Sequence, residues 1–285
     1  MLLCSAPAVG LALFVAPLAT AHDSPVDTVA IDRCVPAYLN RNGIPGAAVA
    51  VVSRDGVVHV AGYGRDSDGA DVTEDTAFPV ASVSKSFTAV AVLRLVEQGT
   101  VRLDDPVVTY LPEFAMADPR ARQITVRNLL AQTSGLDDRR APADPAESLR
   151  QRVSQLAGVR SVRDAGQRHR GHRSAVSSLR AHPGLRDSGP GAGADGVRQR
   201  VAGGRDDRRG HGPLVSAHLN EGVGSDGGRV LSAGSIHVAH RPTARSPEYA
   251  MGWIADDPGE LSHSGGNPTF MAEQTLLLRD AFCYR

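Results

Sequence analysis

The chain has 285 residues, enough for one large domain or two closely associated ones, and its hydrophobic content of 41% is sufficient for a buried core. Its basic and acidic residues balance to a formal net charge of zero, which excludes a general electrostatic attraction to nucleic acid or to an anionic membrane. Of the 31 lysine and arginine residues, 30 are arginines, and Lys85 is the only lysine.

The first 21 residues have the pattern of a secretory leader. An apolar run from Leu2 to Thr20 ends at the A-x-A sequence Ala19 to Ala21, which is typical of signal-peptide cleavage sites. The run is interrupted by Pro17 and is short for a membrane span, so a membrane anchor is the weaker alternative. We therefore expect residues 1–21 to be a signal peptide, residues 22–285 to form the folded domain, and the protein to be secreted or held in the cell envelope.

The segment after this leader predicts a helix followed by a β-hairpin. Residues 26–42 have helical periodicity, and Gly43 directly after them is typical of a helix end. Two β-branched runs, residues 47–52 and 57–63, flank Asp55-Gly56, which is typical of a hairpin turn. This region should therefore supply two adjacent strands of a sheet.

The next predicted helix runs from Ala81 to about Gln98 and carries the most informative residues. Ser82 and Lys85 are three positions apart, so on a helix they lie on one face, a single turn from each other. A serine hydroxyl becomes a strong nucleophile when a neighbour takes its proton, and a lysine amine can do so if its pKa is lowered. S-x-x-K alone is a weak pattern, because the serine can be an ordinary N-cap. Arginine cannot act as a base, so the position of the single lysine favours a catalytic interpretation.

Shorter elements follow along the chain. Residues 103–107 predict the start of a short helix, and residues 124–132 predict a helix capped by Thr125. Near the C-terminus, residues 273–280 predict a strand.

Several segments taken together resemble the class C β-lactamase-related serine hydrolases, a group that includes D-alanyl-D-alanine carboxypeptidases and related esterases. Within this resemblance, His263-Ser264-Gly265-Gly266 is similar to the third motif of the family, the K-T-G or H-x-G strand opposite the nucleophile. Taken alone, His263 would be a solvated strand histidine; its pairing with Ser82 and Lys85 makes it a candidate site residue. The resembling segments are residues 44–136, 217–222 and 249–270, with 82–89, 95–99, 103–107, 110–114 and 124–136 as the densest matches.

The resemblance implies a fold and a chemistry. The fold is of the α/β class, β-lactamase/penicillin-binding-protein-like: an antiparallel sheet flanked by helices plus a mostly helical domain, with the sheet taking strands from both chain ends. The chemistry is acyl transfer, in which Ser82 attacks a carbonyl, Lys85 moves its proton, and His263 is the third catalytic residue. Ser264 and Gly265 would contact the substrate, a β-lactam, D-Ala peptide or ester. Neither metal nor other cofactor is implied, and the expected partner is a small-molecule or peptidoglycan-like substrate, with no nucleic acid.

One departure from the family concerns the Tyr-x-Asn motif, whose tyrosine helps to activate the nucleophile and to protonate the leaving group. This chain has no Phe, Trp or Tyr from Ala115 to Glu248 and therefore no such tyrosine. Residues 139–215 hold 16 arginines against seven acidic residues, a net charge of +9, and their helical and strand periodicity fades. Residues 165–216 are thus atypical.

Three interpretations of this segment remain open. It could be a solvated basic insert that binds an anionic polymer. It could hold a metal through His169, His172, His182 and His211, although their spacing matches no ligand pattern. It could also be translated out of frame, because the next frame of a GC-rich coding sequence for residues 201–216 restores a methionine and a tryptophan typical of the family.

The family would continue beyond Arg285 with at least one more strand and a closing helix, so we expect an incomplete sheet and a truncated C-terminus. The sequence as a whole predicts a serine hydrolase acting through an acyl-enzyme, impaired in this chain. The alternative is a non-catalytic penicillin- or peptidoglycan-binding protein. A third possibility is a basic surface protein that works through the arginine-rich segment.

Overall fold

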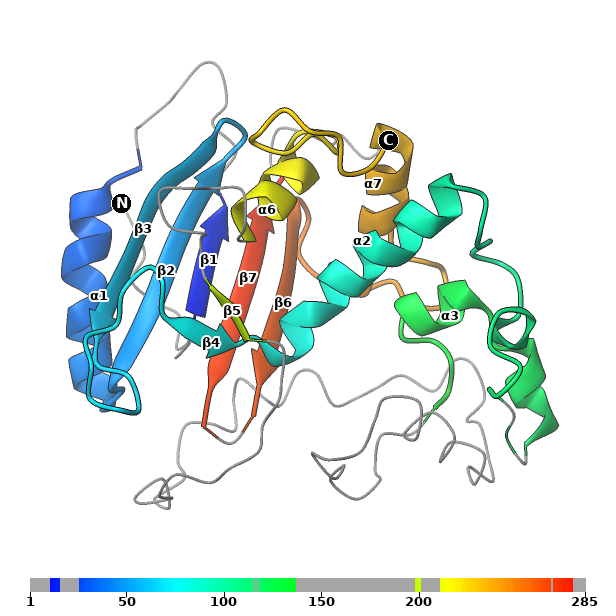
Figure 1. Ribbon diagram of the computed structural model, residues 1–285, viewed down its shortest axis with the longest axis horizontal. Helices are drawn as coiled ribbons and strands as arrows, with labels where there is room; N and C mark the ends of the chain where they lie inside the picture. Colours follow the sequence, from blue (N-terminus) through cyan, green and yellow to red (C-terminus); the bar gives the residue numbers. More distant parts are fainter. Residues whose placement is uncertain are drawn as a thin grey trace.

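The fold is organised around a five-stranded sheet with strand order β3-β2-β1-β7-β6, drawn in blue and red in Figure 1. The computed structural model describes residues 11–15, 26–114, 116, 118–136, 198–200, 211–267 and 269–278. The strands of the sheet are β1 (Leu11–Val15), β2 (Gly46–Ser53), β3 (Gly56–Gly64), β6 (Glu260–Gly266) and β7 (Met271–Leu277).

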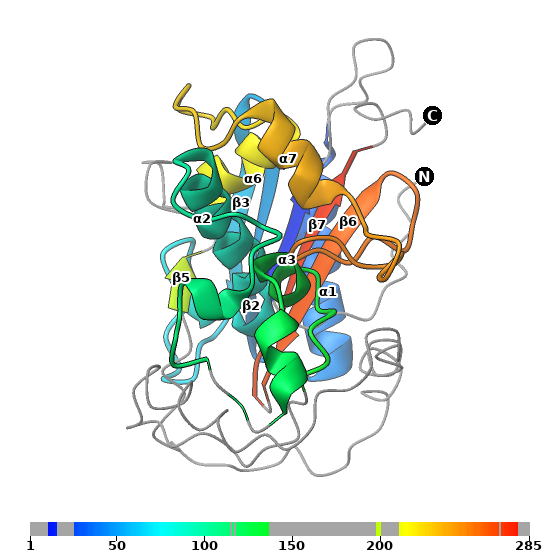
Figure 2. The same ribbon diagram turned by 90° about the vertical axis from the view of Figure 1, so that its right-hand side faces the viewer.

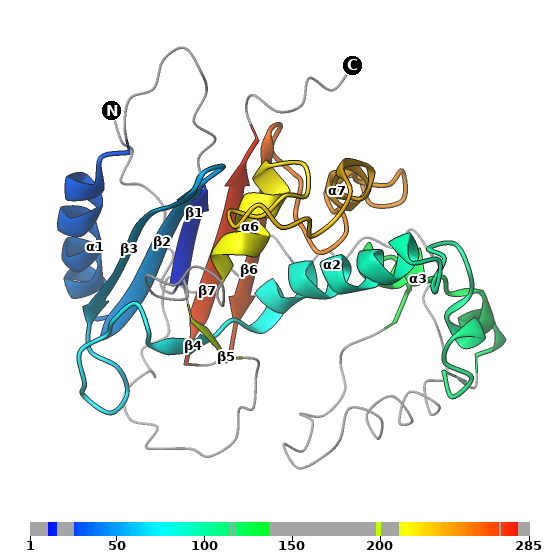
Figure 3. The same ribbon diagram turned by 45° about the horizontal axis from the view of Figure 1, so that its top comes forward.

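Most helices lie on one side of this sheet (Figure 2), and α2 runs from the sheet toward α3 and α7 (Figure 3). A small second sheet pairs β4 with β5 just before the turn that leads into α2. The helices are α1 (Thr28–Asn42), α2 (Ser84–Glu97), α3 (Val126–Leu130), α6 (His211–Leu219) and α7 (Ala233–His240); the 3-10 turns are η1 (Ala81–Val83), η2 (Val107–Thr109) and η3 (Pro119–Gln123), and the short strands are β4 (Ala77–Pro79) and β5 (Arg198–Arg200).

The sheet confirms the expected fold class and takes its strands from both parts of the chain. β2 and β3 form the predicted antiparallel hairpin, with Ser53 opposite Gly56 at the turn, and β6 pairs antiparallel with β7. β1 lies between β2 and β7 and is parallel to both. This strand comes from the run that the sequence predicts to be a signal peptide, so leader cleavage would remove the middle strand of the sheet. Cleavage itself stays a prediction.

The described core has three clusters: one between the sheet and α6, one between α2 and α7, and one around η2 and η3. Buried valine and alanine residues of β2 pack with α6 and Trp253 in the first cluster. Leu93 of α2 packs with Ile236 of α7 in the second. Burying these apolar surfaces on one side of the sheet stabilises the contact between the sheet and the helices.

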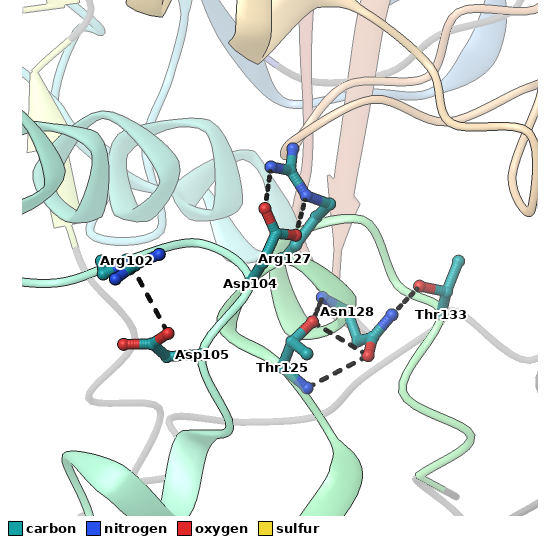
Figure 4. Close-up of polar contacts among 7 residues, drawn as sticks. All are labelled: Arg102, Asp104, Asp105, Thr125, Arg127, Asn128 and Thr133. Carbon is teal, nitrogen blue, oxygen red and sulfur yellow. Dashed lines mark hydrogen bonds and ion pairs between the residues drawn. The ribbon is translucent and has the colours of Figure 1, made fainter.

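The helical part is held together by polar contacts around α3 (Figure 4). Thr125 caps α3 as predicted, and its hydroxyl accepts from the N–H of Asn128 while Asn128 Oδ1 accepts from the N–H of Thr125. Arg127 donates two hydrogen bonds, of 2.7 and 2.8 Å, to the carboxylate of Asp104. The prediction that a helix starts at residues 103–107 is wrong. Pro106 has an extended backbone, and only the 3-10 turn η2 follows it.

A buried pair of histidines lies in the core beside Trp253. His218 Nδ1 of α6 is 2.8 Å from His240 Nε2 of α7, the two rings stack with centroids 5.0 Å apart, and the indole meets His218 edge-on. Both side chains are fully buried, and burial lowers the pKa of His218 to about 4 and that of His240 well below its usual range. Within the described ranges, His218 Nε2 and Trp253 Nε1 have no hydrogen-bond partner. Burying these two polar nitrogen atoms without a hydrogen bond lowers the stability of the fold.

Several sequence expectations lie outside the described residues. Residues 137–197 and 201–210 include most of the atypical segment and the candidate ligands His169, His172 and His182. No helix in the described part of the chain is sufficiently long and apolar to cross a membrane.

Candidate active site

The candidate nucleophile lies on a strained turn at the start of α2. The helix begins at Ser84, three residues later than expected, because Ala81 has φ of 44° and an α-helix cannot include that backbone. Ala81 opens the 3-10 turn η1, and Ser82 is its second residue. A non-glycine residue in the left-handed region costs about 1–2 kcal/mol. Such strain clusters at functional sites and here presents Ser82 between the sheet and α2.

Ser82 and Lys85 meet as the spacing predicts. Lys85 Nζ lies 2.7 Å from Ser82 Oγ, and both side chains are only partly buried. The serine is therefore reachable by a substrate, and the amine is within proton-transfer distance of it. Because a cationic amine can only donate, the pair can activate the serine only when Lys85 is neutral.

The next serine on the same helix has a structural role. Ser86 is fully buried; its hydroxyl donates to the carbonyl of Val83 at 2.9 Å and lies 3.3 Å from Gln274 Oε1 of β7. The Ser86 hydroxyl thus links the turn that carries Ser82 and Lys85 to β7.

Strand β6 packs directly on the turn that carries Ser82. A Cβ on Gly265 would lie 2.1 Å from the carbonyl oxygen of Val80 and 2.8 Å from the nitrogen of Ser82, which is closer than real Cβ atoms approach. The strand can come this near only with glycine at that position. Gly265, predicted to contact substrate, therefore also sets the distance between β6 and the nucleophile.

The other residues of the predicted third motif divide between the two faces of β6. His263 is buried and shares the face of Gly265, whereas Ser264 is half-buried and lies on the opposite face, as the period of two requires. His263 Nε2 is 2.9 Å from the Tyr249 hydroxyl, and Nδ1 is 2.6 Å from the carbonyl oxygen of Ser264. The structure thus brings Ser82, Lys85 and Gly265 together and places His263 in a separate buried pair on the same strand face.

The sequence placed Tyr249 and the turn after it in a segment that resembles the family but indicated no role for either. Burial raises the pKa of the Tyr249 hydroxyl, which keeps it protonated. At Gly252, φ is 78°, and a Cβ there would lie 2.7 Å from the carbonyl oxygen of Lys85. A signal was present, because Tyr249 is the first aromatic residue after the long segment without any.

No three His, Cys, Asp or Glu side chains in the described ranges are grouped so that they could hold a metal ion. The described chemistry is that of a serine, an amine and backbone N–H groups.

Comparisons with known proteins find similar sequences and a similar fold. The sequence profile of the family described as Beta-lactamase matches residues 31–180. Penicillin-binding protein 4 of Amycolatopsis lactamdurans is 44% identical over 103 residues, 35% of this chain and 27% of that protein. Esterase EstB of Burkholderia gladioli is 44% identical over 94 residues, 31% of this chain and 24% of that protein. The matches thus span about a quarter of the length of these two relatives.

A solved structure supports the fold independently. The octameric penicillin-binding protein homologue from Pyrococcus abyssi superposes with a TM-score of 0.59 at 17% identity, over 88% of this chain and 71% of that chain. At this identity the likeness concerns the fold alone.

Proposed function

The chain belongs to the Beta-lactamase family, and from this premise we propose that it is a serine hydrolase in which Ser82 forms an acyl-enzyme. The observation that carries the proposal is the 2.7 Å contact between Lys85 Nζ and Ser82 Oγ in a partly exposed site. An amine beside a serine hydroxyl is the arrangement that a lysine-activated nucleophile needs.

In the proposed reaction, neutral Lys85 takes the proton of Ser82 while Oγ attacks the carbonyl carbon of the substrate. A tetrahedral oxyanion forms and then collapses, which breaks the bond to the leaving nitrogen or oxygen. Lys85 returns its proton to that leaving group, and a water molecule later hydrolyses the ester on Ser82.

Two backbone N–H groups are suited to hold the oxyanion. Ser262 exchanges both backbone hydrogen bonds with Ile254, on the edge of β6 that faces away from β7. In an antiparallel strand the hydrogen-bonding direction alternates, so the N–H of Gly266, four residues on, points to the same open edge. The N–H of Ser82 lies beside Gly265 at the start of η1, where helical N–H groups lack an intrahelical acceptor. These two donors support the acyl-transfer proposal.

The substrate class follows from the relatives by analogy. One is named a penicillin-binding protein and the other an esterase, so the candidate substrates are β-lactams, D-Ala peptides of peptidoglycan and simple esters. A peptidoglycan-like substrate fits a secreted or envelope location, which we propose together with the signal peptide. His263, Ser264 and Gly265 remain the proposed residues on the substrate side of the site.

We further propose that turnover is impaired. The chain lacks a Tyr-x-Asn tyrosine between Ala115 and Glu248, so leaving-group protonation rests on Lys85 alone. The same observation favours a second candidate function, a penicillin- or peptidoglycan-binding protein that is acylated once at Ser82 or only binds.

The test compares hydrolysis of a chromogenic cephalosporin and a short p-nitrophenyl ester by the wild type, Ser82→Ala and the matched control Ser84→Ala. A hydrolase gives multiple turnovers in the wild type and the control and none in Ser82→Ala. A single stoichiometric burst that requires Ser82 identifies the binder. Activity that survives Ser82→Ala would show that the proposed site is wrong.

A further inference from the structure

Strand β6 and the turn at Gly252 both lie close to the backbone around Ser82. Each element carries one residue of a buried hydrogen-bonded pair, His263 and Tyr249. β6 approaches the Val80–Ser82 backbone through Gly265, and the turn at Gly252 approaches the backbone of Lys85. His263 lies two residues before Gly265, and Tyr249 lies three residues before Gly252. The pair is therefore fixed to the same rigid contacts that position the nucleophile.

The hydrogen-bond directions in this pair are determined by chemistry. The Ser264 carbonyl can only accept, so His263 Nδ1, 2.6 Å away, must carry the proton. In a neutral imidazole Nε2 is then an acceptor, and the Tyr249 hydroxyl at 2.9 Å donates to it. The hydroxyl is a dependable donor, because burial raises its pKa and keeps it protonated.

We infer that Tyr249 is a positioning residue for the reaction at Ser82. The Tyr249 hydroxyl donates to Nε2 of His263 and so keeps this histidine neutral, in the Nδ1–H tautomer. The expected effect on the rate of Ser82 acylation rests on the proposed function, whereas the expected tautomer of His263 does not. A neutral His263 adds no positive charge to the side of the site where Lys85 must act as a base.

The charged and titratable residues on the elements around this histidine can be named. Gln274 of β7 is its cross-strand neighbour and is uncharged. The charged residues of α2 are Lys85, Arg94 and Glu97, and the titratable residues at the adjoining turn are Glu248 and Tyr249. Glu260 and Glu273 lie on the opposite face of β6 and β7, in register with the half-buried face. Removing the Tyr249 hydroxyl therefore removes the donor at Nε2 without altering a neighbouring charge.

The test combines nuclear magnetic resonance with kinetics. In wild-type protein, imidazole nitrogen shifts assigned by comparison with His263→Gln should show the Nδ1–H tautomer at pH 7. In Tyr249→Phe, which keeps the ring, the titration midpoint of His263 should rise by about one pH unit or more. The acid limb of the rate of Ser82 acylation by a chromogenic cephalosporin should move upward by the same amount. Tyr110→Phe, which removes a hydroxyl that donates a hydrogen bond to Asp105 just before η2, should change neither.

The outcomes are separable. An Nε2–H tautomer or an imidazolium in the wild type would overturn the inference without any variant having to fold. An unchanged titration of His263 in folded Tyr249→Phe would overturn it as well. If the wild type is never acylated, the proposed function fails, yet the resonance experiment still decides the role of Tyr249.

Discussion

At the scale of single residues, the central feature is an amine that must lose its proton. Lys85 is the only lysine of a chain with 30 arginines, and it lies 2.7 Å from Ser82 Oγ. Arginine would keep the positive charge and much of the packing but cannot accept the serine proton. The distinction between charge and basicity can therefore be tested by one substitution.

We expect Lys85→Arg to lower the rate of Ser82 acylation by about 10²–10⁴-fold, the usual contribution of a general base. The rate is measured with a chromogenic cephalosporin under single-turnover conditions. Arg94→Lys on the same helix is the control, because its guanidinium donates to the carbonyls of Arg229 and Val230 and not to Ser82. Equal acylation rates in Lys85→Arg and wild type would show that Lys85 is not the base.

At the scale of elements, the contact between β6 and η1 sets the geometry of the site. We expect Gly265→Ala to force β6 away from the turn, since its Cβ would lie 2.1 Å from the carbonyl oxygen of Val80. Overpacking of this kind costs about 1–3 kcal/mol of stability. The variant should unfold at a lower denaturant concentration than the wild type, and its rate of Ser82 acylation should be lower.

The control for that change is Gly234→Ala in α7, where the nearest atom to a new Cβ is Ser232 Oγ at 3.8 Å. Alanine is the better helix former, so this variant should be as stable as wild type or more so. If Gly265→Ala behaves like Gly234→Ala, the close approach of β6 is not a determinant of the site.

The histidine pair between α6 and α7 gives a prediction about pH. The folded-state pKa of His218, about 4, is below the value of 6.5 for an exposed histidine, so the unfolded chain binds more protons between these pH values. Stability should therefore be complete above pH 6.5 and fall as the pH drops toward 4, by up to about 3 kcal/mol from His218. His218→Leu should reduce this dependence in denaturant unfolding, whereas Gly234→Ala, which adds no titratable group to α7, should leave it intact. Burial also lowers the pKa of His240, so a smaller loss remains in His218→Leu, and a loss as steep as in the wild type would contradict the assignment.

The elements differ in how far the sequence could predict them. The β2–β3 hairpin, the Thr125 cap and the Ser82–Lys85 contact follow from local rules of turn chemistry, capping and helical spacing, and the structure confirms all three. The left-handed backbone at Ala81, the close approach at Gly265 and the Tyr249–His263 pair depend on contacts between distant segments. Sequence periodicity contains no signal for such contacts, and it also mistook the 3-10 turn η2 for a helix.

At the scale of the whole molecule, the middle of the sheet connects the two parts of the chain. β1 pairs with β2 through residues such as Leu13↔Ala50 and with β7 through Leu13↔Gln274. Without β1, both neighbouring strands would expose unpaired N–H and C=O groups, which favour aggregation.

We therefore expect a chain lacking residues 1–21 to unfold at lower denaturant concentration than the full chain and to aggregate more on size-exclusion chromatography. A deletion of residues 1–9 that retains β1 is the matched control. Identical behaviour of all three chains would show that β1 contributes nothing to the stability of the sheet.

The most direct test of the account is the mass of the protein after incubation with benzylpenicillin, followed by peptide mapping. Acylation opens the β-lactam ring without releasing a fragment, so the protein should gain the mass of the whole penicillin molecule. The added mass should lie on the peptide that contains Ser82, be absent in Ser82→Ala and remain in Ser84→Ala. No added mass with penicillin or with an activated ester, or an adduct on a different residue, would contradict the assignment of Ser82 as the nucleophile.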